Sequence, residues 1–211
     1  MKGLPEDGMT QAPVTLRRNT RLNSDDWVRA ALEVIGEDGV AALAVEPLAR
    51  RLGVTKGSFY WHFPTRDALL EAALQTWETQ EQAALAANLE KISDSTDRMR
   101  AMITLVSYER GFVTVFAQLL KASEHPIVGP VIQRTSQRRL HYIEDGYLRT
   151  GMSGTDARYR AWLAYSAYIG FMQVNMHLQD ARMTSEQFGD YVDHVVQTLV
   201  PPPQARTGRR G

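Results

Sequence analysis

The side chains with the most evident chemistry lie close together, in the segment TKGSFYWHFPTR at positions 55–66. Lys56 can neutralise a phosphate or donate hydrogen bonds to a guanine edge, and the Ser58 hydroxyl can donate to a phosphate or a base. The Tyr60 hydroxyl suits a phosphate oxygen, whereas the Trp61 ring can pack on thymine methyl groups or on sugars. Together these residue types indicate contact with a nucleic acid.

Helical periodicity separates the bulky rings of this segment into two faces. At 100° per residue, Phe59 and Phe63 lie within 40° of one another, so both can point into a core. Gly57, Tyr60 and Trp61 lie mostly on the other side. Gly57 has no side chain to keep the backbone away from a groove. The rings on the outer face either contact a nucleic acid or cover another domain.

The elements that would position this outer face are two short helices, expected at 45–52 and 55–63. Gly53 can adopt the left-handed conformation of a tight turn between them, and Ala49 is small enough to let the two helices approach. Leu48, Ala49, Gly53, Val54 and Phe59 have the spacing of a helix-turn-helix, whose second helix enters the major groove of DNA. Thr65 can cap the next helix, and Arg66 in its first turn is in reach of a flanking phosphate.

Almost all of the remaining sequence predicts helices and no strand. The first helix begins at the polar run NSDD (residues 23–26) and ends at Gly39. A long helix follows from Thr65 to about position 88. Further helices are expected at about 96–109, 111–123, 127–149, 155–179 and 185–199. The fold class is therefore all-α.

The segment GVTKGSFYWHFPTRDALLEAAL, residues 53–74, resembles the signature of TetR-family transcriptional regulators. The resemblance extends over about residues 23–74. It implies a three-helix DNA-binding domain joined by a fourth helix to a variable helical ligand-binding and dimerisation domain. Family members are mostly homodimeric repressors that small molecules release from their operators. Carried over by position, the DNA contacts fall on Lys56, Gly57, Ser58, Tyr60, Trp61, His62 and Arg66.

One part of the sequence departs from the family pattern. Ala44 stands where a Ser or Thr cap is usual, so the phosphate contact expected from that cap is lost, and Glu46 can repel DNA. Arg17, Arg18 and Arg21 lie in an N-terminal arm, which either reaches phosphate or minor groove or is a solvated tail.

The second half is expected to hold a cavity lined mainly by apolar and aromatic side chains. Each candidate taken alone is more often part of the core than a ligand contact. No acidic or basic cluster is evident there, so we expect a neutral or hydrophobic ligand. The candidate ligand-binding residues are Trp77, Met102, Tyr108, Phe116, Tyr142, Tyr165, Tyr168 and Met172.

The helix at 157–176 is apolar on nearly all sides, which indicates burial on several faces. The last helix adds a second apolar stripe. Two such helices from each of two protomers would form a four-helix dimer interface. A homodimer also suits a near-palindromic operator, because two recognition helices about 34 Å apart read two half-sites.

Composition excludes several classes of function. The chain of 211 residues has no cysteine and a net charge of zero, with 24 Lys and Arg against 24 Asp and Glu. No apolar run reaches the ~20 residues of a transmembrane helix, and no secretory signal is evident, so we expect a cytoplasmic protein. The five histidines have no metal-binding spacing, and no catalytic constellation or nucleotide loop is present. We expect neither an enzyme, a metal nor a cofactor.

The sequence thus predicts a sequence-specific DNA-binding regulator, a homodimeric repressor released by a small hydrophobic or aromatic ligand. The expected organisation is an arm at 1–20, a helix-turn-helix domain at 21–66, a ligand-binding and dimerisation domain at 67–200, and a tail at 201–211. The alternative is a DNA-organising or protein-docking factor with the same fold and no metabolite ligand.

Overall fold

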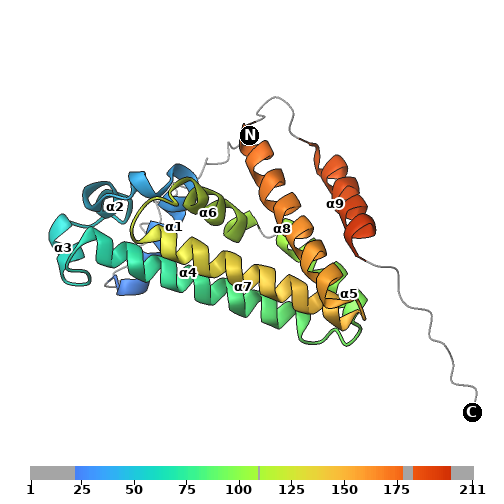
Figure 1. Ribbon diagram of the computed structural model, residues 1–211. Helices are drawn as coiled ribbons and strands as arrows, with labels where there is room; N and C mark the ends of the chain where they lie inside the picture. The colour runs from blue at the N-terminus through green and yellow to red at the C-terminus, as the bar shows by residue number, and fades with distance from the viewer. Residues whose placement is uncertain (1–21, 109, 178–182, 201–211) are drawn as a thin grey trace, which may run out of the picture.

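The computed structural model describes residues 22–108, 110–177 and 183–200, and within these ranges the chain is helical and has no strand. Its helices are α1 (Ser24–Asp38), α2 (Val45–Arg51), α3 (Lys56–Tyr60), α4 (Arg66–Leu89), α5 (Ser95–Tyr108), α6 (Arg110–Lys121), α7 (Val128–Arg149), α8 (Gly154–His177) and α9 (Ser185–Leu199), with a 3₁₀ turn, η1 (Val40–Ala42), after α1. Figure 1 shows α1 to α3 grouped at one end, with α4 and α7 extending away from them toward α5, α8 and α9. The predicted all-α class is confirmed. The arm at 1–20 and the tail at 201–211 lie outside the described residues.

The first helix begins where the sequence supplies a cap. The Asn23 side chain accepts a hydrogen bond from the Asp26 backbone N–H, and the Asp26 carboxylate accepts one from the Asn23 backbone N–H, both at 3.0 Å. This capping box satisfies two donors that the first helical turn leaves unpaired. The inner face of α1 buries Trp27 and Ile35 completely, and the helix ends at Gly39 as predicted.

The turn between α2 and α3 depends on Gly53. Its φ of 69° lies in the left-handed region, which side chains other than glycine rarely adopt. The Val54 backbone N–H then donates to the Ala49 carbonyl at 3.0 Å, which closes the turn. This is the helix-turn-helix that the spacing predicts.

The helix predicted at 55–63 is shorter in the structure, where α3 ends at Tyr60. The backbone N–H groups of His62 and Phe63 both donate to the Phe59 carbonyl, at 2.9 and 3.0 Å. Pro64 disfavours the helical conformation in the residue before it, so the chain leaves the helix there. Phe63 remains buried despite lying beyond the regular helix.

The fourth helix connects the two ends of the molecule. The Thr65 hydroxyl caps it by accepting a hydrogen bond from the Ala68 N–H at 3.0 Å. Its 24 residues span about 36 Å at 1.5 Å per residue. The remaining predicted helices agree with α5 to α9 to within about two residues, apart from the C-terminal end of the helix predicted at 155–179, because residues 178–182 lie outside the described ranges.

Two hydrophobic clusters hold these helices together. The first includes Trp27 and Phe59 from the N-terminal helices, Trp77 from α4, Phe116 from α6 and Met172 from α8. The second joins α5, the end of α7, the start of α8 and α9, through residues such as Met99, Tyr147, Ala161 and Val196. The first cluster therefore continues from the helix-turn-helix into the helices around the middle of the molecule. In the described ranges, no helix has both the length and the hydropathy required to span a membrane.

Candidate DNA-contacting surface and ligand cleft

The two rings predicted to point inward anchor α3. Phe59 is completely buried, with its ring edge-on to Trp27 of α1 at a centroid distance of 5.4 Å. Phe63 is also buried and lies 5.9 Å from Phe59. This aromatic cluster fixes the rotation of α3 about its axis. The inward prediction for both phenylalanines is confirmed.

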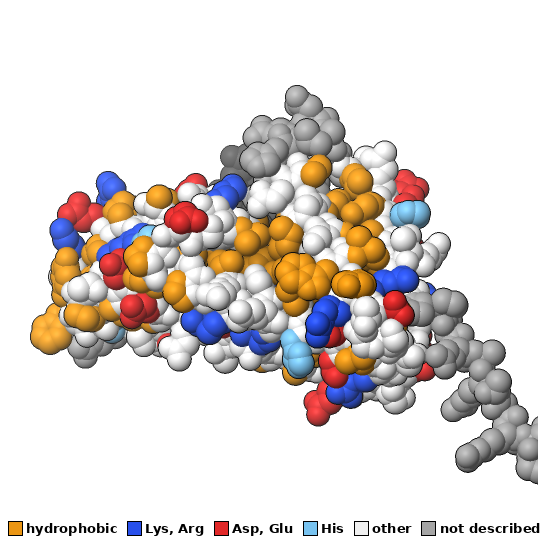
Figure 2. Space-filling view, in the orientation of Figure 1, with side chains coloured by type: hydrophobic (Ala, Val, Ile, Leu, Met, Phe, Trp, Pro, Cys, Tyr) orange, Lys and Arg blue, Asp and Glu red, His pale blue; other side chains and the backbone are white. Residues whose placement is uncertain are grey.

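The opposite side of α3 and the turn after it form an exposed surface, which we call the α3 face (Lys56, Gly57, Tyr60 and Trp61). Trp61 is 85% exposed and Tyr60 is 54% exposed. The Tyr60 ring is edge-on to Phe59 at 5.2 Å, so it stands on the core while its outer edge stays accessible. Figure 2 shows hydrophobic side chains at this end of the molecule, interspersed with charged ones. An exposed tryptophan on a rigid support is typical of a binding surface.

Lys56 is paired with the residue that departs from the family pattern. Its ammonium nitrogen lies 2.7 Å from the Glu46 carboxylate, and both side chains are exposed. The hydrogen bond between them lowers the pKa of Glu46 and raises that of Lys56, so both groups stay charged near neutral pH. Ala44 precedes α2 with no side-chain cap, as expected. The phosphate contact predicted for Lys56 would therefore have to displace Glu46.

The Arg66 guanidinium binds groups of its own chain. Its Nε donates to the Leu43 carbonyl at 3.1 Å and its Nη2 to the Val40 carbonyl at 2.7 Å. Its Nη1 contacts the Asp67 carboxylate at 2.9 Å. These bonds tie the start of α4 to the first residue of η1 and to the residue that follows η1. The phosphate contact assigned to Arg66 stays a prediction, as do those of Ser58 and His62, whose side chains are half-buried.

The second half contains an open cleft of about 970 Å³ lined by side chains from α4 to α9. Several predicted ligand-binding residues come together on its wall: Met102, Tyr142, Tyr165, Tyr168 and Met172. Trp77 and Phe116 are instead stacked on each other in the core, at 5.9 Å and 9°. Tyr108 lies at the end of α5, and its side chain is outside those that the structure describes. That the cleft binds a ligand stays a prediction.

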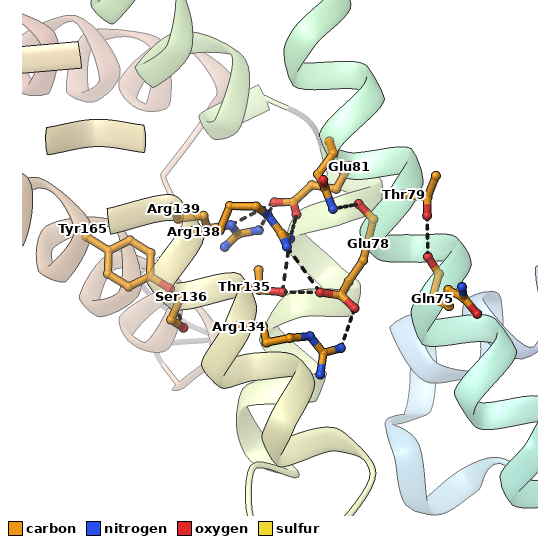
Figure 3. A network of polar contacts seen from close by, with 11 residues as sticks. Gln75, Glu78, Thr79, Glu81, Arg134, Thr135, Ser136, Arg138, Arg139 and Tyr165 are labelled. Atoms are coloured by element: carbon orange, nitrogen blue, oxygen red, sulfur yellow. Dashed lines mark hydrogen bonds and ion pairs between the residues drawn. The ribbon is translucent and has the colours of Figure 1, made fainter. Parts of the chain in front are cut away.

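A charged network beside the cleft was missed by sequence reasoning. Glu78 and Glu81 of α4 face three arginines of α7, as Figure 3 shows. Glu78 binds Arg134 at 2.8 Å, and its other oxygen contacts Arg138 at 3.4 Å. The sequence shows no acidic or basic cluster in this half, because these residues are more than 50 positions apart and only packing of α4 on α7 brings them together. The one available signal was helical spacing, i and i+3 for the glutamates.

Arg139 occupies the inner end of this α4–α7 network. Its Nε and Nη2 both donate to one Glu81 oxygen, with a distance of 2.8 Å from Nε. The guanidinium carbon lies 3.8 Å from the centre of the Phe116 ring and 5.8 Å from that of Tyr168. The Arg139 Nη1 is buried and has no hydrogen-bond partner among the described residues. Burial raises the pKa of the Tyr168 hydroxyl, so this group keeps its proton at neutral pH.

One side of α8 exposes large apolar side chains. Trp162 and Leu163 are each 57% exposed and Tyr159 is 69% exposed, whereas Ala161 and Tyr165 of the same helix are buried. Figure 2 shows hydrophobic side chains gathered where α8 crosses this face of the molecule. An exposed cluster of this kind is typical of an interface with another protein. The prediction that this helix is buried on several sides thus holds only if a partner covers it.

Residues 28–73 match the family model described as "Bacterial regulatory proteins, tetR family". A tetracycline repressor of class A from an Escherichia coli transposon is 45% identical over 53 residues, which cover 25% of this chain and 24% of the repressor. The matched segment is thus about a quarter of that relative's length. The regulator CymR of Pseudomonas putida is 27% identical over 150 residues, covering 68% of this chain and 74% of CymR.

The whole described fold also resembles solved structures. A TetR-family transcriptional regulator from Agrobacterium tumefaciens aligns with a TM-score of 0.71 at 18% identity, covering 84% of this chain and 97% of that one. At this identity the likeness concerns the fold alone. Within the described residues, no group of three or more His, Asp or Glu side chains is placed to hold a metal ion.

Proposed function

The chain belongs to the TetR family of bacterial regulatory proteins by its N-terminal domain, and from that premise we propose that it is a homodimeric repressor that a small molecule releases from DNA. The observation that carries this proposal is the α3 face. A tryptophan that is 85% exposed stands beside a lysine and a glycine on a helix whose buried side is fixed by Phe59. The second helix of a helix-turn-helix presents such a face to the major groove.

The roles of the site residues follow from their place on this surface. Lys56 and the Tyr60 hydroxyl contact phosphate or base edges, and Trp61 packs on thymine methyl groups or sugars. Gly57 lets the helix backbone approach the groove. Ser58, His62 and Arg66 complete the set, and the two N–H groups of Arg66 that the bonds to Leu43, Val40 and Asp67 do not use can donate to a phosphate.

The helices after residue 66 supply the sensor in this proposal. The cleft has the volume of a site for a drug-sized molecule, and its wall combines apolar side chains with a few hydroxyl groups. Phe116 of α6 belongs to the same hydrophobic cluster as Trp27 of α1. A ligand that displaces α6 therefore acts on the packing of the helix-turn-helix. The chain accordingly divides near position 66 into a DNA-binding part and a ligand-binding and dimerisation part.

A second copy of the chain is the partner proposed for the apolar side of α8. Covering Tyr159, Trp162 and Leu163 removes their large apolar surface from water, which favours association. The two α3 faces of such a dimer would read two half-sites of a near-palindrome.

The experiment begins with selection of bound sequences from random DNA and continues with affinity measurements on the recovered operator. Lys56→Ala and Tyr60→Ala should each weaken binding by tenfold or more, on the order of 1–3 kcal/mol per base or phosphate contact. Lys91→Ala removes an exposed lysine at the far end of α4 and should leave the affinity unchanged. Equal affinity of all three variants and the unmodified protein would refute the role of the α3 face.

The alternative, a DNA-organising or docking factor without a metabolite, requires a regulatory half without a site for a small molecule. A cleft of about 970 Å³ in this half favours the sensor. Binding of DNA without sequence preference, with no small molecule altering the affinity, would support the alternative.

A further inference from the structure

The charges on the wall of the cleft are strongly unbalanced. Among the described residues that line it, four carry a positive charge, Arg98, Lys121, Arg138 and Arg139, and only Glu81 carries a negative charge. The chain as a whole has equal numbers of acidic and basic residues. The excess of positive charge is therefore local to this cleft, and it would repel a cationic ligand and attract an anion.

The α4–α7 network holds its three arginines to different degrees. Arg134, Arg138 and Arg139 share two carboxylates, those of Glu78 and Glu81. Arg138 contacts both glutamates, but only at 3.4 and 3.5 Å. Arg134 is 56% exposed, so water compensates much of its charge. The excess that concerns a ligand is the one on the cleft wall, where four positive charges face only Glu81 among the described residues.

Arg139 is the group with an unused binding edge. Its side chain is only 16% exposed, and Glu81 occupies the Nε and Nη2 side of the guanidinium. The buried Nη1 has no hydrogen-bond partner among the described residues. The Phe116 ring supports one face of the guanidinium at 3.8 Å, and because the N–H groups lie in the guanidinium plane, the free edge keeps a fixed direction. A buried, charged N–H group without a hydrogen-bond partner is costly, so a ligand that supplies an acceptor would be stabilised there.

Much of the remaining wall of the cleft is apolar and suits the body of an organic molecule. Met102, Ile103, Phe171, Met172, Phe188 and Val195 line it. The Tyr165 hydroxyl donates to Ser136 at 2.9 Å, and Tyr168 beside Arg139 keeps its proton and can donate to an anion.

We propose that the cleft binds an amphipathic organic anion, a largely apolar molecule whose single carboxylate is received by the free edge of Arg139. This inference rests on the proposed function, because it specifies the ligand of the proposed sensor. A neutral ligand can offer the Arg139 Nη1 an acceptor, but it leaves the excess positive charge of the cleft uncompensated. A carboxylate supplies both the acceptor and the charge, and the guanidinium fork matches its geometry.

The test compares probes that differ only in their head group. Octanoate, octanol and octylamine form one series, and 2-naphthoate, 2-naphthalenemethanol and 2-naphthylmethylamine form the other. In calorimetric titrations of the full-length protein, the carboxylates should bind at least about tenfold tighter than the matched alcohols. A hydrogen bond to a charged group contributes enough free energy for this difference. The amines should bind more weakly than the alcohols.

Three variants locate the effect at Arg139. Arg139→Met keeps the length of the side chain and should reduce carboxylate binding to the level of the alcohol. Arg134→Met removes an arginine of the same network that does not line the cleft, so the preference for the carboxylate should persist. Glu81→Gln removes the competing anion and should strengthen carboxylate binding, which keeps the proposal testable if Arg139→Met does not fold.

The proposal is overturned if alcohols or amines bind as tightly as carboxylates, if none of the carboxylates binds at millimolar concentration, or if Arg139→Met retains the preference. The selected operator is assayed in parallel. Sequence-specific DNA binding together with a preference for amines or alcohols would refute the proposal of an anionic ligand, but it would leave the proposed function as a DNA-binding regulator intact. A preference for carboxylates without sequence-specific DNA binding would instead refute the proposed function as a regulator.

Discussion

At the scale of single residues, the contact between Lys56 and Glu46 bears on how strongly the α3 face would attract DNA in the proposed function. The two groups lie 2.7 Å apart and are both exposed. A phosphate that binds Lys56 must displace Glu46 and approach its negative charge. Because the pair is exposed, salt screens it, and the effect on affinity is modest.

Glu46→Gln should therefore raise the affinity for the operator several-fold at low salt. It should also steepen the dependence of affinity on salt by about one counterion, because Lys56 becomes available to a phosphate. Lys56 lowers the pKa of Glu46, so the carboxylate is ionised throughout the neutral range and the gain should be the same at pH 6 and pH 8. Glu90→Gln, at the far end of α4, is the control. An affinity gain in the control, or none in Glu46→Gln, would contradict this role.

Sequence alone placed the residues of the α3 face correctly but missed those around Arg139. Phe59, Tyr60 and Trp61 are neighbours in one helical turn, so periodicity decides which ring points inward. Arg139 meets Glu81 from 58 positions away, through the packing of α7 on α4, and no local pattern encodes that contact. The carbonyl partners of Arg66 were missed for the same reason.

At the scale of the element, two glycines four positions apart have different roles. Gly53 has a φ of 69°, and a Cβ added there would meet nothing within 4 Å. Gly57 lies inside α3, where an added Cβ would meet only the Thr55 hydroxyl oxygen, at 3.7 Å. Gly53 is therefore needed for the backbone conformation of the turn, whereas Gly57 keeps a side chain off the outer surface of α3.

Gly53→Ala should lower the free energy of unfolding by about 1–2 kcal/mol, because the left-handed conformation strains any residue with a Cβ. Gly53→Asn should cost less, since asparagine tolerates this region better. Gly57→Ala should retain full stability and lose operator affinity. Urea unfolding monitored by circular dichroism measures the change in stability, and operator binding measures the change in affinity, so the two effects can be separated. Equal stability losses at both positions would contradict the assignment.

Hydrogen bonds from two side chains hold the C-terminal end of α9. The buried Tyr147 hydroxyl donates to the Leu199 carbonyl at 3.1 Å, and Arg160 donates to the same oxygen at 3.3 Å. Burial raises the pKa of Tyr147 from its usual 10.0 to about 12, while Arg160 acts in the opposite direction. The folded protein thus holds the tyrosine proton more tightly than the unfolded chain does.

Tyr147→Phe should lower the free energy of unfolding by about 1 kcal/mol at neutral pH, the usual net contribution of one hydrogen bond. The contribution is fully present below pH 10 and is lost as the pH rises toward 12, because the unfolded tyrosine ionises first. Denaturant midpoints of the two proteins should therefore converge between pH 10 and 12. A difference that grows over this interval would contradict the assignment.

At the scale of the whole molecule, one hydrophobic cluster runs from Trp27 in the helix-turn-helix to Phe116, on which Arg139 rests. In the proposed function, ligand binding and DNA binding would thus act on a shared core. If an effector weakens DNA binding, DNA must weaken effector binding by the same factor, typically ~1–3 kcal/mol. The exposed side of α8 lies outside this cluster and remains open to a second copy of the chain.

Leu163→Glu should convert the proposed dimer into a folded monomer. The side chain is 57% exposed in one chain, so the substitution costs little within the fold but introduces a charge into the proposed interface. Gln137→Glu adds the same charge on an exposed position of α7 and should leave the dimer intact. Light scattering coupled to size exclusion gives both masses. An unmodified protein that is monomeric at tens of micromolar would contradict the interface.

The most direct test of the central claim compares two affinities at about 0.15 M salt, one for the operator recovered by selection and one for the same DNA with its sequence scrambled. We expect the operator to bind at least about 10³-fold tighter than the scrambled DNA, which is the lower end of the range for specific DNA-binding proteins. Lys56→Ala should reduce this ratio. Equal affinity for both DNAs would contradict the claim that the α3 face reads sequence.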